Sequence, residues 1–310
     1  MPVSEVDLEG RRVFVTGASG FVGSRLVQRL ERGGAIVVAT DRELDVSNGS
    51  LLAPALDAAR PDAVVHLAAV SFVPESIDRP EATWRVNYLG AKTLLETAAG
   101  LTTRPRVLLV GSSQVYGSAK PQDPPFDERS PLRPDTPYAW TKAAADLLGA
   151  AWSRRGLDVV RVRPFNHTGP GRPEQFVESS FARQIAENEA GQRPPRIAVG
   201  NLDAVRDFLD VEDVIDAYLR LLDPALAPGV YNVASGIGIS VGTLLDALLA
   251  HSTASPEVAT EQSRWRPTDA SVGDAGHLME ATTWKPRRAL AQTLGALLEY
   301  WREQIRSAPC

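Results

Sequence analysis

Short apolar segments alternate with longer amphipathic segments through the first half of the chain. The apolar segments are rich in valine and read as β-strands that are buried on both faces. They are Val13–Thr16, Ala35–Thr40, Ala63–Leu67, Arg106–Val110 and Val159–Val162. The amphipathic segments between them predict helices at Val22–Arg32, Leu51–Ala59, Trp84–Ala99 and Pro137–Arg154. This alternation predicts an α/β fold, with a doubly wound, Rossmann-like parallel sheet and helices on both faces.

The alternation stops after Arg163. Helices are expected at 177–191, 211–222, 241–251 and 290–305, with one short strand at 230–233 and a polar, irregular stretch at 252–267. We interpret this half as a smaller C-terminal lobe, some segments of which return to the first domain. The expected division is 1–165 with 204–233 for the cofactor domain, and 166–203 with 234–310 for the substrate lobe.

Composition narrows the class of protein. Hydrophobic residues make up 44% and charged residues 23%, which is typical of a globular protein. The net charge of −5 without a basic cluster argues against a nucleic-acid partner. One cysteine and four scattered histidines offer no disulfide and no metal-binding pattern. With no signal peptide and no apolar run of membrane-spanning length, we expect no membrane association and a cytoplasmic location.

Three glycines lie between the first predicted strand and the first predicted helix. Gly17, Gly20 and Gly23 form a G-x-x-G-x-x-G pattern, which allows the backbone to approach a pyrophosphate at the helix N-terminus. Asp41 ends the second strand, where a carboxylate binds ribose hydroxyls and repels a 2′-phosphate. Asp41 therefore favours NAD(H), while the adjacent Arg42 keeps NADP(H) open.

A tyrosine and a lysine stand four residues apart in the segment PYAWTK. Tyr138 and Lys142 would share one face of a helix, where the ammonium would lower the pKa of the phenol and allow it to transfer a proton. Ser112 and Ser113 follow a buried strand, at the sheet edge where such folds bind ligands. The three residue types together predict hydride transfer with a nicotinamide cofactor, coupled to protonation of an oxygen.

The motifs TGASGFVG, HLAA, SSQVYG, YAWTK and RPFNHTGPG, in this order, resemble the extended short-chain dehydrogenase/reductases that modify nucleotide sugars. The resemblance implies that Ser112, Tyr138 and Lys142 are catalytic, and that Asp45 and Val46 lie beside the adenine. It also implies a larger set of cofactor contacts. These are Gly17, Ser19, Gly20, Phe21, Val22, Asp41, Arg42, Leu67, Ala68, Ala69, Asn87, Tyr138, Lys142 and Pro164.

Within that family, RPFNHTGPGRPEQFV, VGNLDAVRDFLDV and RPTDASVGDAGHL look most like GDP-4-keto-6-deoxy-mannose reductases and GDP-mannose 4,6-dehydratases. The likeness implies that Asn166 and Arg206 hold the diphosphate, and that Asn201, Leu202 and Arg266 line the nucleotide site. Ser71, Ser113 and Gln114 would contact the substrate. A surface ion pair of Arg206 with Asp207 or Asp210 remains the alternative, and His167 is expected to be satisfied within its own loop.

One position separates the two relatives. Sugar-nucleotide dehydratases carry a glutamate where this chain has Gln114, and an amide cannot act as a general acid or base. We therefore expect reduction of a GDP-linked 4-keto-6-deoxy sugar to GDP-D-rhamnose. An epimerase or dehydratase of the same fold and a non-catalytic NAD(P)-sensing regulator remain alternatives. Relatives pair through the helices at Trp84–Ala99 and Pro137–Arg154, so a homodimer is expected.

Overall fold

The computed structural model describes residues 7–261 and 269–307. Its central feature is a six-stranded parallel sheet in the order β2-β1-β3-β4-β5-β9. The strands are β1 (Arg12–Thr16), β2 (Ile36–Thr40), β3 (Ala63–His66), β4 (Arg106–Val110), β5 (Val159–Pro164) and β9 (Val230–Val233). β1 has β2 on one side and β3 on the other, which is the switch point where such sheets bind ligands. The predicted doubly wound sheet is confirmed.

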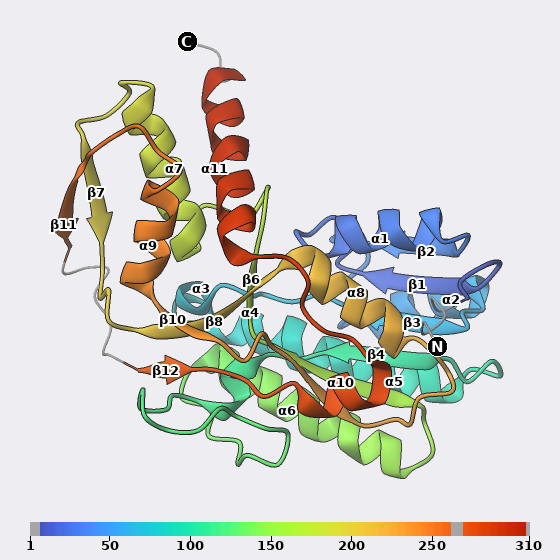
Figure 1. Ribbon diagram of the computed structural model, residues 1–310. Coiled ribbons are helices and arrows are strands. Elements are labelled where there is room, and N and C mark those ends of the chain that lie inside the picture. Colours follow the sequence, from blue (N-terminus) through green and yellow to red (C-terminus); the bar gives the residue numbers. More distant parts are fainter. Residues whose placement is uncertain (1–6, 262–268, 308–310) are drawn as a thin grey trace.

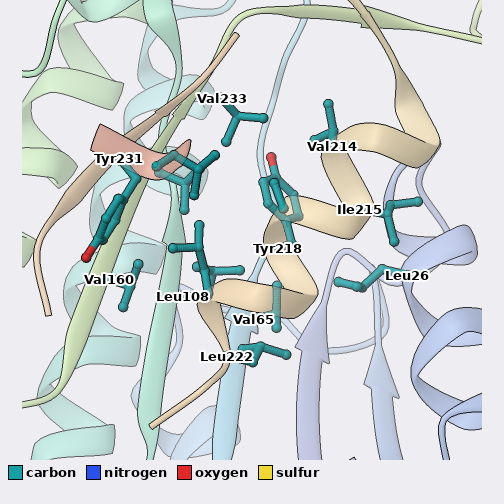
Figure 2. Packing of buried hydrophobic residues seen from close by; sticks show 14 of the residues in the cluster. Leu26, Val65, Leu108, Val160, Val214, Ile215, Tyr218, Leu222, Tyr231 and Val233 are labelled. Atoms are coloured by element: carbon teal, nitrogen blue, oxygen red, sulfur yellow. The ribbon is translucent and has the colours of Figure 1, made fainter. Parts of the chain in front are cut away.

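Helices cover both faces of this sheet because successive residues of each strand point to opposite sides. Val13 and Val15 pack with α1 (Gly23–Arg32) and α8 (Val211–Leu221), while Phe14 packs on the other face. Figure 2 shows Tyr218 and Leu222 against Val65 and Leu108 of the sheet. The other face is covered by α2 (Gly49–Ala59), α5 (Gly90–Gly100) and α6 (Pro137–Arg154).

The helix expected at 84–99 is interrupted. The segment consists of α4 (Pro80–Trp84), one π-helical turn, η1 (Arg85–Leu89), and then α5. α3 (Val73–Asp78) precedes it. A π turn widens the helix locally, as such turns commonly do near functional sites. Here it carries Asn87, whose side chain is buried.

The second lobe has its own hydrophobic core. It is built from α7 (Val177–Glu189), α9 (Val241–Leu249) and α11 (Leu290–Ser307), which stand side by side in Figure 1. β7 (Arg196–Val199) pairs in parallel with β11 (Glu257–Thr260). The expectation that 252–267 is irregular is therefore wrong for β11. This strand is short and mostly exposed, so its pattern is too weak to predict it, and its pairing is a tertiary contact.

A small mixed sheet joins the two lobes. β8 (Val205–Asp210) pairs with β6 (Asn166–Thr168), β10 (Gly238–Ser240) and β12 (Ala270–Ser271). α10 (Gly276–Thr282) and Trp284 return to the core of the parallel sheet. We propose the lobe boundaries expected from the sequence, with 275–284 reassigned to the cofactor domain because its apolar side chains pack there. No helix in the described ranges is both long and apolar enough to cross a membrane.

Candidate active site

The loop between β1 and α1 passes close to the chain that follows β3. Gly17 has a φ of +71°, and a Cβ at this position would lie 2.7 Å from the backbone nitrogen of Ala68. A Cβ at Gly23 would collide with the carbonyl oxygen of Gly17. Both positions therefore require glycine, whereas Gly20 is less crowded. Ser19 and Gly20 are exposed, so the backbone of the loop is accessible beside the start of α1. These residues fit a bound dinucleotide pyrophosphate.

Asp41 follows β2 and is tied to this loop. Its carboxylate accepts a hydrogen bond from the Ser19 backbone nitrogen at 2.8 Å and one from the Arg42 backbone nitrogen at 2.9 Å. Burial opposes ionisation, but the hydrogen bonds from Ser19 and the charge of Arg42 hold the pKa of Asp41 below its usual value. The carboxylate is therefore charged at neutral pH, which is the state that repels a 2′-phosphate. The Arg42 side chain is exposed next to it.

The other expected cofactor residues lie along the same edge of the sheet. Leu67, Ala68 and Ala69 form the half-buried segment after β3, and Pro164 ends β5. Phe21 and Val22 are half-buried at the start of α1. Asp45 binds Ser47, and Val46 is buried against Gly90. The structure therefore brings the expected set to one edge of the sheet, around the switch point.

The side chain of Asn87 holds the segment after β3 in place by hydrogen bonds. Its side-chain oxygen accepts from the Val70 backbone nitrogen at 2.8 Å, and its amide nitrogen donates to the Val70 carbonyl and the Thr141 hydroxyl, each at 3.0 Å. Thr141 in turn donates to the Tyr138 carbonyl at 2.7 Å. Asn87 therefore links the loop after β3 to the helix that carries the candidate catalytic residues.

Ser112, Tyr138 and Lys142 form what we call the catalytic corner. Ser112 follows β4 and begins the 3₁₀ turn η2 (Ser113–Tyr116), while Tyr138 and Lys142 occupy successive turns of α6. Thr136 caps α6 by accepting from the Ala139 backbone nitrogen, and Pro137 begins the helix. Ser112 is hydrogen-bonded to Tyr138, and the Lys142 ammonium donates to the Val110 carbonyl at 2.9 Å. The structure brings together all three residues that the sequence singled out.

The electrostatics of this corner differ from expectation. Burial raises the pKa of Tyr138, and the hydrogen bond from Ser112 and the positive charge of Arg172 only partly offset it. Burial also lowers the pKa of Lys142 to about 8. The sequence-based expectation that Lys142 lowers the pKa of Tyr138 is therefore wrong. Desolvation is the largest contribution, and the lysine is bonded to a backbone carbonyl.

A cavity of about 750 Å³ opens between the two lobes. Among the substrate residues expected from the sequence, Asn166, Asn201 and Arg206 line it. Leu202 does not line it, because its side chain packs into the second core and its carbonyl accepts from the Gly242 backbone nitrogen. Ser71 is exposed next to Phe72, which does line the cavity. Arg266 lies outside the described residues.

Gln114 and Ser113 lie on η2, at the side of the catalytic corner. Ser113 is buried, and the backbone nitrogen of Gln114 donates to the Ser112 hydroxyl at 3.2 Å. Gln114 itself is half-buried and stands two residues after Ser112 on the same short turn. In the ranges that the structure describes, no group of acidic residues, histidines or cysteines could hold a metal ion.

Arg206 makes an ion pair, but not with the partners considered from the sequence. Its side chain bonds to the Asp269 carboxylate at 2.7 Å and to the carbonyls of Val205 and Asp269. Asp207 is instead fully buried, accepting from Ser235, Gly236 and Gly273. The side-chain amide of Asn166 donates to the Asp207 carbonyl at 3.2 Å. His167 is satisfied locally, as expected, by donating to the Phe165 carbonyl at 2.9 Å.

Several cavity residues were not anticipated from the sequence. The rings of Phe72 and Phe176 meet edge to face at 5.9 Å between centroids, and both line the cavity with Arg172 and Phe181. Arg172 and Phe176 belong to the motif RPFNHTGPGRPEQFV. Nothing in the sequence, however, distinguishes them from ordinary loop residues. Their placement depends on how the lobes pack together.

The chain is similar to known proteins over nearly its whole length. Residues 13–234 match the model of the NAD dependent epimerase/dehydratase family. GDP-6-deoxy-D-mannose reductase of Pseudomonas aeruginosa is 37% identical over 304 residues, covering 96% of this chain and 99% of that protein. UDP-glucose 4-epimerase of Mycolicibacterium smegmatis is 30% identical, covering 94% and 99%.

A solved structure of RMD from Pseudomonas aeruginosa in complex with NADPH superposes with a TM-score of 0.86 and 36% identity. It covers 95% of this chain and 99% of the solved chain. The agreement extends across both lobes and therefore includes the edge of the sheet and the cavity described above. Together with the match over residues 13–234, it shows that the chain belongs to the NAD-dependent epimerase/dehydratase family.

Proposed function

We propose that the protein reduces the C4 ketone of GDP-4-keto-6-deoxy-D-mannose to give GDP-D-rhamnose, using NAD(P)H. The observation that carries the proposal is the catalytic corner with Gln114, and not a carboxylic acid, on its 3₁₀ turn. Ketone reduction needs one proton donor, which Tyr138 provides. Elimination of water also needs a group that moves the C5 proton, and an amide cannot do this. The similarity to a GDP-6-deoxy-D-mannose reductase supports the same substrate.

In this proposal each residue of the corner has a definite task. The dinucleotide, when bound along the glycine-rich loop, supplies the hydride. Tyr138 donates its phenolic proton to the C4 oxygen, and its raised pKa keeps it protonated at neutral pH. Ser112, hydrogen-bonded to Tyr138, orients that oxygen. Lys142 is fixed by the Val110 carbonyl and places a positive charge beneath the site.

The test is chromatography of two incubations. With GDP-4-keto-6-deoxy-D-mannose and NADPH or NADH, we expect loss of absorbance at the reduced-cofactor band and appearance of a GDP-6-deoxyhexose. With GDP-mannose and the oxidised cofactor, we expect no 4-keto product. Accumulation of that product would contradict the role assigned to Gln114, because another residue would have to carry the C5 proton.

An epimerase is the second candidate, favoured by the similarity to UDP-glucose 4-epimerase. An epimerase regenerates its cofactor in every turnover, so it would interconvert UDP-glucose and UDP-galactose without net consumption of NAD(P)H. A third incubation with UDP-glucose separates the two functions. We expect no UDP-galactose, and its formation would replace reduction by epimerisation.

We also propose that the chain forms a homodimer in the cytoplasm. Apolar side chains are exposed on the adjacent elements α3, η1 and α6: Ile77 is 59% exposed, Leu89 39%, Trp140 46% and Leu147 59%. Exposed apolar side chains gathered on neighbouring helices are typical of a subunit interface. Light scattering at micromolar concentration should give twice the mass of the chain, and Trp140→Glu with Leu147→Glu should give the monomer. A monomeric unmodified protein would contradict the proposal.

A further inference from the structure

Arg172 lies in the loop between β6 and α7 and is held by aromatic rings. Its guanidinium carbon is 3.5 Å from the ring centroid of Phe176 and 5.2 Å from that of Phe21, which belongs to the glycine-rich loop. The side chain is only 13% exposed. Two rings from opposite lobes thus fix the plane of the guanidinium, so it is ordered before any ligand binds.

The hydrogen bonds of Arg172 leave the two terminal nitrogens of its guanidinium available to a ligand. The Nε donates to Glu178 at 3.2 Å, and that carboxylate is 3% exposed. Within residues 7–261 and 269–307, neither terminal nitrogen of Arg172 donates to another protein group. These two nitrogens are the pair that binds two phosphate oxygens side by side.

Three other arginines that line the cavity already use a terminal nitrogen in an ion pair. Arg206, Arg183 and Arg193 each place a terminal nitrogen on a carboxylate, respectively that of Asp269, Glu174 and Glu187. Their side chains are also more exposed than that of Arg172, at 22%, 41% and 31%. Arg172 is therefore the cavity arginine whose terminal nitrogens are best placed to bind a ligand.

Its position is also distinctive. Arg172 lines the cavity together with Asn166 and Arg206, and its charge acts on the phenol of Tyr138. Arg172 is thus close enough to Tyr138 for its charge to act there, and it shares the cavity wall with the residues expected to hold the diphosphate. In a nucleotide sugar, the diphosphate joins the nucleoside to the hexose, and its charge suits a guanidinium.

We propose that Arg172 binds the hexose-bearing phosphate of the nucleotide sugar and so sets how far the sugar reaches toward Tyr138. This inference rests on the proposed function, because it requires a nucleoside-diphosphate sugar as the substrate. Arg172 acts on binding and placement of the substrate, while the proton still comes from Tyr138.

The test compares ligands that have or lack this phosphate. Arg172→Gln combined with Glu178→Gln removes the ion pair without leaving a buried charge unpaired. By calorimetry we expect this double variant to bind GDP about tenfold to a hundredfold more weakly, the range for hydrogen bonds to charged groups. Binding of GMP and of NADPH should be unchanged. In turnover with the 4-keto substrate, KM should rise.

Two further variants make the result interpretable. Arg302→Gln with Glu189→Gln removes another arginine–glutamate pair anchored on α7, away from the cavity, and should bind GDP normally. Arg172→Lys keeps a positive charge beside Glu178 but loses the fork, so GDP binding should weaken by about threefold to tenfold. If the double variant binds neither GDP nor NADPH and its circular dichroism spectrum shows that it is not folded, Arg172→Lys alone decides the question.

Three results would overturn the inference. They are unchanged GDP binding, an equal loss for GMP, or a loss of NADPH affinity in place of GDP affinity, which would assign Arg172 to the cofactor pyrophosphate. Failure of the proposed function looks different. In that case the unmodified protein binds neither GDP nor UDP, whatever residue stands at 172.

Discussion

The catalytic corner and the cavity between the lobes are neighbours, yet they are built differently. The corner is almost closed to solvent, with Tyr138 7% and Lys142 6% exposed, and it stands on a strand end and one long helix. The cavity is open and about 750 Å³ in volume, and its lining combines α7 and strands of the smaller sheets with loop residues at 172–176 and 200–204. Three of its arginines pair with acidic side chains. The chemistry is thus held on one helix and one strand end, while recognition is spread over several elements, part of them loops.

A buried ion-pair network holds α6 against the sheet on the same helix face as Tyr138 and Lys142. Asp146, one turn beyond Lys142, accepts from Arg161 at 2.8 Å and from Arg163 at 2.9 Å, both on β5. Arg163 also donates to the Tyr116 hydroxyl at 2.9 Å, close to η2 and Ser112. The helix and the turn that carry the three catalytic candidates are therefore joined through one buried network. The cavity has a smaller buried pair of its own, Arg172 with Glu178.

The largest effect is expected from Tyr138→Phe. Because Tyr138 is the proton donor of the corner, kcat should fall by about 10²–10⁴-fold, the usual contribution of general acid catalysis. NADPH binding should be nearly unchanged. Tyr116→Phe is the matched control, since it removes another buried phenol that bonds to Asn232. It should lower the melting temperature and leave most of kcat. More than about a tenth of the activity surviving in Tyr138→Phe would remove the residue from this role.

The pH profile should report Lys142 next. Its pKa is lowered to about 8, so the ammonium loses its proton as pH rises through that value, well below the range of a free lysine. We expect kcat/KM for reduction to be level at neutral pH and to fall above about pH 8. Lys142→Arg should retain some activity and move the fall to higher pH. A level profile to pH 9.5 in the unmodified protein would show that the charge of Lys142 is not required.

Arg206→Gln should affect recognition more than chemistry. Since Arg206 is expected to hold the diphosphate but already bonds to Asp269, we expect KM for the nucleotide sugar to rise by about threefold to tenfold with a smaller change in kcat. Steady-state kinetics at saturating cofactor measures both. If KM is unchanged and only the melting temperature falls, Arg206 serves the structure through Asp269, and the cavity must bind phosphate elsewhere.

The smallest effect is expected from Asp41→Ala. Its charged carboxylate should repel a 2′-phosphate, so we expect NADH to be used at least as well as NADPH by the unmodified protein. Asp41→Ala should shift the ratio of kcat/KM values toward NADPH, and Arg42→Gln should shift it toward NADH. A strong preference of the unmodified protein for NADPH would show instead that Arg42 dominates.

The parallel sheet and the catalytic corner can be predicted from the sequence, whereas the smaller sheets around the cavity cannot. The parallel sheet follows from valine-rich strands buried on both faces, and the corner follows from the spacing of Tyr138 and Lys142 on one helix. β6, β10 and β12 are two or three residues long, and β7 and β11 are only four, so they carry too few positions for a periodic pattern. β6, β8, β10 and β12 pair where the lobes meet, and β7 pairs with β11 within the second lobe, so both arrangements depend on tertiary contacts.

The direction of the pKa shift of Tyr138 and the ion-pair partner of Arg206 could not be predicted from the sequence either. Lys142 stands one turn from Tyr138, yet burial raises the tyrosine pKa, and burial is a property of the folded chain. Arg206 finds its partner 63 residues away, past the segment 262–268, while the nearby acids considered from the sequence have other roles. Sequence spacing identifies residues on one element. It does not rank partners that tertiary packing brings together.

The network beneath α6 has a consequence for how such a protein can change over time. Asp146 holds α6 to β5 through Arg161 and Arg163, and none of these three side chains lines the cavity. Residues of the cavity lining can therefore be replaced without breaking the contacts that hold α6 in place. Mutations that alter the accepted sugar or base are therefore separated from those that abolish the reaction. The lining of the cavity can therefore vary while the geometry of the catalytic corner stays fixed. This separation suits the protein to directed evolution toward new nucleotide sugars.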